Sequence, residues 1–154
     1  MTVALLGVGA NLGYREETIK RAIVELNANP HVQVQKVSKL IETKAVSRFE
    51  QPDFLNGACQ IETTLDPLQL LTFTQDIEKN LGRTAKGHGD PRTIDIDILF
   101  YGKEVLSFEH LIVPHLLLHE RPFVLAPLFE IAPQFMHPVL QEPISSIYYR
   151  VVGY

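Results

Sequence analysis

Apolar residues recur with two different periods along this chain, and the order of the two periods restricts the fold more than any other feature. A nearly continuous apolar run over 2–9 predicts a central strand. Spacings of three and four residues over 15–27 predict a helix, and alternation over 32–42 predicts a second strand. The pattern then repeats with a strand, a helix and a strand over 54–64, 67–81 and 93–100. The order β-α-β-β-α-β is that of a ferredoxin-like α+β fold, an antiparallel sheet with both helices packed on one face.

Residues with strong capping and turn preferences mark the ends of these elements. Asp66 and Pro67 predict an N-cap followed by a proline in the first helical turn, and Gly82 predicts the end of that helix. Gly9 and Gly13 predict a break after the first strand. Beyond residue 101 we expect an extension of short strands and helical turns, interrupted by Pro114, Pro122, Pro127, Pro133, Pro138 and Pro143.

Composition limits the classes of protein to which the chain can belong. Its 154 residues predict a single domain over 1–154, and a hydrophobic content of 45% is enough for a packed core. A net charge of −4 excludes a globally basic nucleic-acid binder. The lone Cys59 cannot form an internal disulfide, and its strand-like setting favours a buried apolar role over a nucleophile. With no signal-peptide pattern and no membrane-length apolar run, we expect a cytoplasmic protein without membrane contact.

Two aspartates alternate with isoleucines in the last predicted strand. Residues two apart on a strand share a face, so Asp95 and Asp97 point to one side while Ile94, Ile96 and Ile98 face the core. Two like charges roughly 7 Å apart on one strand face repel each other. A shared Mg²⁺ ion would relieve this repulsion, because Mg²⁺ takes one or two carboxylates together with substrate phosphates.

The loop over 82–92 precedes this strand and contains three glycines and the cations Arg83, Lys86 and Arg92. Such a loop can fold over a polyphosphate, although it is not a Walker loop. Surface loops often have the same composition. The alternative interpretation of the aspartate pair is also open at this point: a solvent-exposed strand face partly neutralised by Arg92.

Two shorter clusters suggest ligand contacts. His115 and Arg121 can both donate hydrogen bonds to phosphate oxygens, although a lone histidine is more often a surface or capping residue. Phe54 and Asn56 are two apart on a predicted strand and suit a flat, hydrogen-bonding heterocycle, although phenylalanine in a strand is ordinarily core. The histidines show no zinc spacing.

Seven segments together resemble the 6-hydroxymethyl-7,8-dihydropterin pyrophosphokinase family of folate biosynthesis. The most specific segment is Pro-Arg-Thr-Ile-Asp-Ile-Asp within 91–99. The other segments occur in the family's order and bring the resemblance to residues 3–133; they are 9–13, 42–43, 51–56, 77–83, 113–115 and 120–128. The resemblance implies the ferredoxin-like fold and transfer of pyrophosphate from ATP to the pterin alcohol, giving AMP and the pterin diphosphate.

The resemblance also implies roles for individual residues. Asp95 and Asp97 resemble the ligands of two Mg²⁺ ions, and with Arg83 and Arg92 they form the expected catalytic set. ATP binding is implied for Gln75, Glu78, Lys86, Arg92, Ile98, His110, Ile112, His115 and Arg121. Pterin binding is implied for Thr43, Lys44, Val46, Phe54, Asn56, Asp95 and Phe123.

The chain departs from the family pattern in two loops. Gly89 and Asp90 stand where many members have Trp-Gly, and 43–45 is Thr-Lys-Ala where members often have Thr-Pro-Pro. We expect activity to be retained with weaker substrate binding. The resemblance implies a monomer that can associate with other folate-pathway enzymes. One alternative is a nucleotide- or pterin-sensing module without catalysis. Another is an RNA-recognition module, although this chain lacks the aromatic residues that such a module carries on its sheet.

Overall fold

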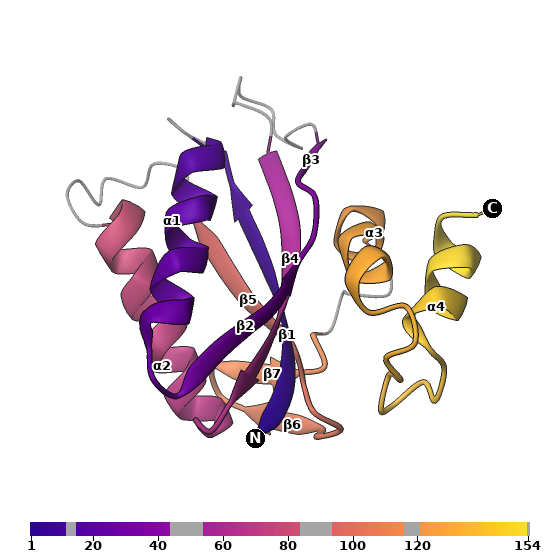
Figure 1. Cartoon of the computed structure of the whole chain (residues 1–154). Helices are drawn as coiled ribbons and strands as arrows, with labels where there is room; N and C mark the ends of the chain where they lie inside the picture. The colour runs from indigo at the N-terminus through magenta and orange to yellow at the C-terminus, as the bar shows by residue number, and fades with distance from the viewer. Residues whose placement is uncertain (12–14, 44–53, 84–93, 116–120, 154) are drawn as a thin grey trace.

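A five-stranded antiparallel sheet forms the centre of the computed structural model, which describes residues 1–11, 15–43, 54–83, 94–115 and 121–153 (Figure 1). The strand order is β2-β4-β1-β5, and β3 pairs with the other end of β4. The strands are β1 Thr2–Ala10, β2 Val32–Val37, β3 Ile41–Thr43, β4 Phe54–Thr63 and β5 Asp95–Tyr101. This arrangement confirms the predicted ferredoxin-like α+β fold.

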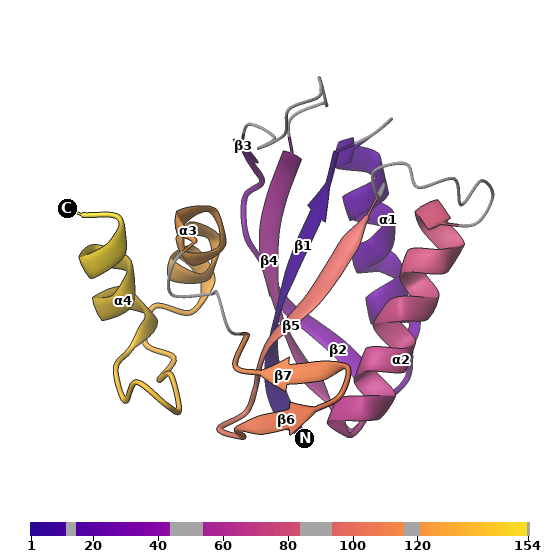
Figure 2. The same cartoon turned by 180° about the vertical axis from the view of Figure 1, so that it is seen from behind.

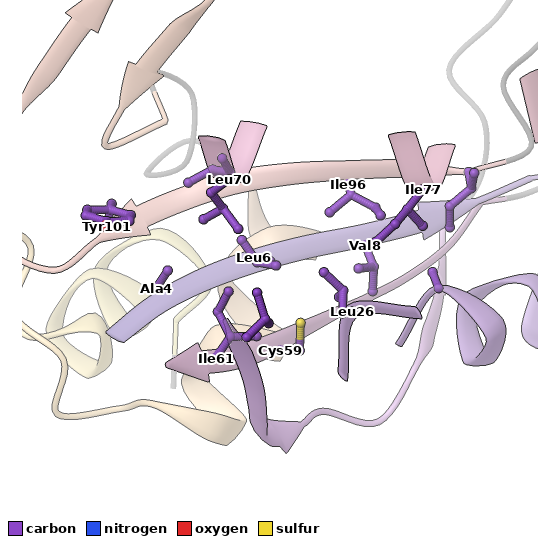
Figure 3. Packing of buried hydrophobic residues seen from close by; sticks show 14 of the residues in the cluster. Ala4, Leu6, Val8, Leu26, Cys59, Ile61, Leu70, Ile77, Ile96 and Tyr101 are labelled. Atoms are coloured by element: carbon purple, nitrogen blue, oxygen red, sulfur yellow. The ribbon is translucent and has the colours of Figure 1, made fainter. Parts of the chain in front are cut away.

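Helices α1 (Arg15–Ala28) and α2 (Pro67–Glu78) cover one face of the sheet (Figure 1). Most of the apolar residues that predicted the two helices are buried, and they pack against the β1, β4 and β5 side chains of this face (Figure 3). Asp66 caps α2 as predicted: its carboxylate accepts from the Gln69 N–H at 2.8 Å, and the Gln69 side chain accepts from the Asp66 N–H at 2.9 Å.

The C-terminal extension covers part of the opposite face. Helices α3 (Pro122–Ile131) and α4 (Ile144–Val151) lie on this side of the sheet (Figure 2). They bury a second apolar cluster against Leu5 and Phe100. A hairpin of β6 (Leu106–Phe108) and β7 (Leu111–Val113) follows β5. None of the helices in the described ranges has the length and apolar character needed to cross a bilayer.

A register shift in β5 changes which residues face each layer. Leu6 pairs with Ile98 whereas Leu5 pairs with Phe100, so Leu99 is an additional residue on β5. Leu99 and Phe100 therefore both contribute to the α3 side. The predicted alternation holds from Ile94 to Ile98 and fails beyond it, because the bulge shifts the pattern by one residue.

The single strand predicted over 32–42 is wrong, because the structure divides it into β2 and β3. At the division, the Ser38 hydroxyl accepts the Ala58 N–H at 2.9 Å and donates to the Lys39 carbonyl at 2.8 Å. Leu40 then packs over Gly57, where an added Cβ would lie 2.7 Å from the Leu40 side chain. A side-chain hydrogen bond thus redirects the chain between the two strands.

The predicted break after the first strand is confirmed within one residue, since β1 ends at Ala10, whereas the breaks predicted at Gly82 and Pro127 are absent. β1 continues through Gly9, because β4 and β5 pair with it from both sides there. α2 ends at Glu78, and Gly82 lies inside a following π-helical turn, η1 (Lys79–Arg83), because Lys79 keeps right-handed helical angles. Pro127 lies within α3; it cannot donate to the Phe123 carbonyl, but the buried side chains around it hold the helix in place.

Candidate active site

A cleft of about 540 Å³ opens on the α3 side of the sheet, within the size range of small-molecule sites. Strands β4, β1 and β5 provide its floor, and the start of α3 provides one wall. Its lining consists of Gly7, Val8, Gly9, Phe54, Asn56, Gly57, Asp95, Asp97, Leu99, Arg121, Phe123 and Val124. Six of the predicted site residues are brought together here, from three segments far apart in sequence: β4, β5 and the start of α3.

The floor of the cleft is a row of polar residues separated by glycine. Gly9 pairs with Asn56 of β4 on one side and with Asp95 of β5 on the other. Two residues along, Gly7 pairs with Asp97. A Cβ at Gly9 would lie only 2.8 Å from the Asn56 Oδ1. Glycine therefore leaves the space in which the amide of Asn56 and the carboxylate of Asp95 face the same cleft.

Two aromatic side chains line the cleft from different elements. Phe54 begins β4, and Phe123 lies in the first turn of α3, directly after Pro122. The guanidinium carbon of Arg121 lies 5.8 Å from the centroid of the Phe123 ring, within the range of a cation–π contact. Aromatic faces next to the Asn56 amide suit a flat heterocycle with hydrogen-bonding groups at its edge.

The aspartate pair faces the cleft as the strand pattern predicts. Asp95 is half-buried and Asp97 is exposed, and both line the cavity. Within the described ranges no group of three or more metal-binding side chains occurs. Two carboxylates alone do not make a protein cage for a metal, but they fit Mg²⁺, which completes its coordination with phosphate oxygens and water. The donor set therefore fits the metal that the family resemblance implies.

Three residues predicted to bind ATP lie on α2 or in the core between α2 and the sheet. Gln75 is exposed on α2, and Ile98 is buried in the core between the sheet and the helices. Glu78 is buried, and its Oε2 accepts a hydrogen bond from the Ile96 N–H at 2.7 Å. None of the three belongs to the lining of the cleft given above, and their contact with a nucleotide stays a prediction.

Three further predicted ATP contacts lie in or after the hairpin that follows β5. His110, in the turn, and Ile112, on β7, are exposed. His115 is half-buried, and its N–H donates to the Leu99 carbonyl at 3.1 Å. This bond joins the segment after β7 to the bulge of β5, next to the cleft. Their nucleotide contacts also stay predictions.

The remaining predicted residues fall outside what the structure describes. Lys44, Val46, Lys86 and Arg92 lie outside the described ranges, as do the departures at 89 and 90. Thr43 ends β3 and Arg83 ends η1, and the description of both is limited to the backbone.

Several lining residues were not predicted from the sequence. Gly7 and Gly9 were assigned to a strand and its end, and Gly57, Leu99 and Val124 received no role. Glycines inside a strand are a usable signal, since they often mark a place where another group approaches the backbone. The contribution of Leu99 could not be found this way, because it depends on the bulge.

The comparisons with known proteins point to one family. The sequence model of the 7,8-dihydro-6-hydroxymethylpterin-pyrophosphokinase (HPPK) family matches residues 5–133. The chain belongs to this family. It is 46% identical over 132 residues to the 2-amino-4-hydroxy-6-hydroxymethyldihydropteridine pyrophosphokinase of Bacillus subtilis (strain 168), covering 86% of this chain and 79% of that protein.

Other HPPK relatives are longer proteins. The chain is 43% identical over 131 residues to the bifunctional protein FolKE of Lactococcus lactis subsp. cremoris, and these residues make up 85% of this chain and 38% of that protein. It is 41% identical over 144 residues to the folic acid synthesis protein fol1 of Schizosaccharomyces pombe, covering 94% and 20% respectively. The chain thus spans well under half the length of either relative.

Solved structures support the fold. The wild-type HPPK-DHPS of Plasmodium falciparum with pteroate superimposes with a TM-score of 0.77 at 16% identity. The match covers 97% of this chain and 42% of that one. At this identity the likeness concerns the HPPK fold alone.

Proposed function

We propose that the cleft on the α3 side of the sheet is the catalytic centre of this HPPK-family enzyme. The chain catalyses the pyrophosphokinase step of folate biosynthesis: it transfers pyrophosphate from ATP to 6-hydroxymethyl-7,8-dihydropterin and gives AMP and the pterin diphosphate. The observation that carries the assignment to the cleft is the row Asn56–Gly9–Asp95, with Asp97 on the same face. In this row the Asn56 amide can hydrogen-bond to a heterocycle, and the two carboxylates can bind the metal ions of a polyphosphate.

The aromatic and amide groups account for the pterin. Phe54 and Phe123 would contact the two faces of the ring, and Asn56 would hydrogen-bond to its edge. Asp95 lies across Gly9 from Asn56 and would meet the end of the pterin that bears the hydroxymethyl group. In this orientation the alcohol points toward the aspartate pair, where the phosphates must arrive.

The charges of the described lining do not suit a free polyphosphate. Asp95 and Asp97 contribute two negative charges, whereas Arg121 contributes one positive charge. We propose that Asp95 and Asp97 hold two Mg²⁺ ions, which when bound supply the positive charge that neutralises the phosphates and makes the alcohol more acidic. Arg121 would donate to phosphate oxygens, and Arg83 and Arg92 are proposed to stabilise the transferring group.

The reaction requires alignment more than a strong base. The hydroxymethyl oxygen attacks the β-phosphorus, a new O–P bond forms, and the bond from the β-phosphorus to the oxygen that bridges it to the α-phosphorus breaks, releasing AMP. The alcohol proton would pass to a carboxylate oxygen of Asp97, which is exposed and can release it to water. The chain's contribution is to place both substrates in line in a partly enclosed cleft.

AMP production tests this proposal directly. Purified protein is incubated with ATP, 6-hydroxymethyl-7,8-dihydropterin and Mg²⁺, and AMP and the pterin diphosphate are quantified by chromatography. We expect equal amounts of the two products, and neither product when the pterin or Mg²⁺ is omitted. ADP in place of AMP, or turnover that persists with excess chelator, would contradict the proposal. Binding of both substrates without any turnover would instead favour a sensing module.

We further propose that residues 1–154 act as one domain and that this chain associates with other enzymes of folate biosynthesis. Fusion of HPPK regions to further sequence in FolKE and fol1 supports such an association. The monomeric state, the cytoplasmic location and the absence of nucleic-acid and membrane partners expected from the sequence stay predictions.

A further inference from the structure

Glu78 is a buried carboxylate at the C-terminal end of α2, next to the strand that carries the aspartate pair. Only 4% of the residue is exposed, and it lies among the residues that α2 packs against the sheet. Burial of a carboxylate is costly unless hydrogen bonds or charges compensate it. A glutamate in this layer therefore needs a physical reason that an apolar residue would not satisfy.

The contact that Glu78 makes with β5 supplies a reason. Among the described strands, β5 is an edge strand that pairs only with β1. In an antiparallel pair, alternate residues direct their N–H groups away from the partner strand. The Ile96 N–H donates instead to Oε2 of Glu78 at 2.7 Å. The carboxylate thus provides the acceptor that a further strand would otherwise have provided.

Ile96 is the one residue between Asp95 and Asp97. On its inner edge, β5 is held by β1 through the pairs Gly9–Asp95 and Gly7–Asp97. On its outer edge, the peptide that joins Asp95 to Ile96 is held by Glu78. The tilt of this peptide sets the direction of the Asp95 side chain and the spacing of the two carboxylates, so Glu78 is in a position to control both.

We propose that Glu78 is a positioning residue for the aspartate pair: through the Ile96 N–H it fixes β5 so that Asp95 and Asp97 present their carboxylates to a metal-bound nucleotide. This inference rests on the proposed function. It assigns Glu78 an action through the backbone, distinct from the direct nucleotide contact that the family resemblance implies. Groups that hold metal ligands in this way commonly change metal affinity by about 10- to 100-fold.

Three substitutions distinguish the effect of side-chain length at position 78 from the effect of its charge and from a general loss of stability. Glu78→Gln keeps the length and one acceptor oxygen but removes the charge. Glu78→Asp keeps the charge but is one methylene too short to reach the Ile96 N–H. Ile77→Val is the matched control: Ile77 packs beside Ile96 and Val8 in the same layer and is 2% exposed, so its truncation loosens packing without removing the hydrogen bond (Figure 3).

The readout is the Mg²⁺ concentration that half-saturates binding of a non-hydrolysable ATP analogue, measured by titration calorimetry. Amide hydrogen exchange at Ile96 is measured in parallel. We expect Glu78→Asp to raise the half-saturating Mg²⁺ concentration about tenfold or more and to speed exchange at Ile96. Glu78→Gln and Ile77→Val should stay within about threefold of wild type, even where thermal stability falls.

Two outcomes would overturn the positioning role. Glu78→Asp could destabilise the fold yet leave the Mg²⁺ requirement unchanged, which is the result for a merely structural residue. Alternatively, affinity for the analogue without Mg²⁺ could fall as much as affinity with Mg²⁺, which is the result for a direct nucleotide contact. If the wild-type protein itself bound no analogue with Mg²⁺ present, the proposed function would fail first, and the two failures are thereby distinguished.

Discussion

Asn56 and Asp95 lie on the two strands that flank β1, each directly opposite Gly9. The pairing brings together residues separated by 39 positions in sequence, with a single residue that has no side chain between them. The width of this gap is fixed by the strand spacing of about 4.8 Å on either side. Gly9 therefore decides whether the amide and the carboxylate can act on one ligand.

Substitution of Gly9 tests this arrangement. In Gly9→Ala, the new Cβ would lie 2.8 Å from the Asn56 Oδ1, so the amide must move. Loss of one hydrogen bond of about 1.4 kcal/mol should raise the KM for the pterin roughly tenfold and leave the KM for ATP within about twofold. Steady-state kinetics with each substrate varied in turn measures both values.

The comparison variant is Gly7→Ala, whose Cβ meets only the end of the Leu99 side chain, at 3.3 Å. That side chain can shift by a few tenths of an ångström, so we expect a smaller rise in the pterin KM than for Gly9→Ala. The reverse order of the two effects would argue against the role given to Gly9.

Removal of the Phe123 ring should weaken pterin binding. Phe123→Leu retains an apolar side chain but loses the flat face, and aromatic contacts contribute about 1 kcal/mol beyond simple burial. We expect the Kd for a fluorescent pterin to rise about five- to tenfold. Tyr149→Leu removes an aromatic ring from the exposed side of α4 and should leave this Kd unchanged. Equal effects of the two substitutions would show that the measured change reflects the fold and not the cleft.

The Asp97 carboxylate should matter for turnover and not for folding. Asp97 is exposed, so Asp97→Asn should change the free energy of unfolding by less than about 0.5 kcal/mol. It should lower kcat on the order of 10²- to 10³-fold, since a group that stabilises transition-state charge is lost. Chemical denaturation and AMP release measure the two quantities. A variant with nearly normal turnover would contradict the role proposed for this carboxylate.

The buried thiol of Cys59 should make the free energy of unfolding depend on pH in the alkaline range. Burial raises the pKa of its thiol to about 12. Between about pH 9 and pH 12 the unfolded chain loses this proton while the folded chain keeps it, so the thiol favours the folded state less as pH rises. Its contribution to stability should fall by at most about 1.4 kcal/mol per pH unit in this range. Urea denaturation from pH 8 to pH 10.5 measures the slope, which should be shallower in Cys59→Ala.

Strand β5 is an element whose local structure could be predicted from the sequence. Alternation of Asp95 and Asp97 with three isoleucines indicated a strand with one polar face, and the structure confirms that the two aspartates share a face, which lines the cleft. The N-cap at Asp66 could also be predicted from the sequence, because it depends only on residues within one helical turn. Short-range patterns of this kind determine local structure directly.

Features that depend on pairing between distant strands could not be predicted. Gly9 has the local preferences of a strand end, but partners on both sides keep it inside β1. The bulge at Leu99 and the bond between Glu78 and Ile96 arise from the register of β5 against β1 and from its packing on α2. Neither relationship has a signature within one segment. The polar and aromatic side chains of the cleft could thus be predicted from the sequence. The strand pairing that places them next to one another could not.

The position of the metal relative to β5 distinguishes most sharply between a metal-binding and a solvent-exposed aspartate pair. A crystal structure with Mg²⁺, a non-hydrolysable ATP analogue and the pterin would locate it. We predict oxygens of both Asp95 and Asp97 about 2.1 Å from Mg²⁺, with phosphate oxygens completing the coordination. Mg²⁺ held by phosphate and water alone, with both carboxylates turned away, would show that Asp95 and Asp97 do not form the metal site.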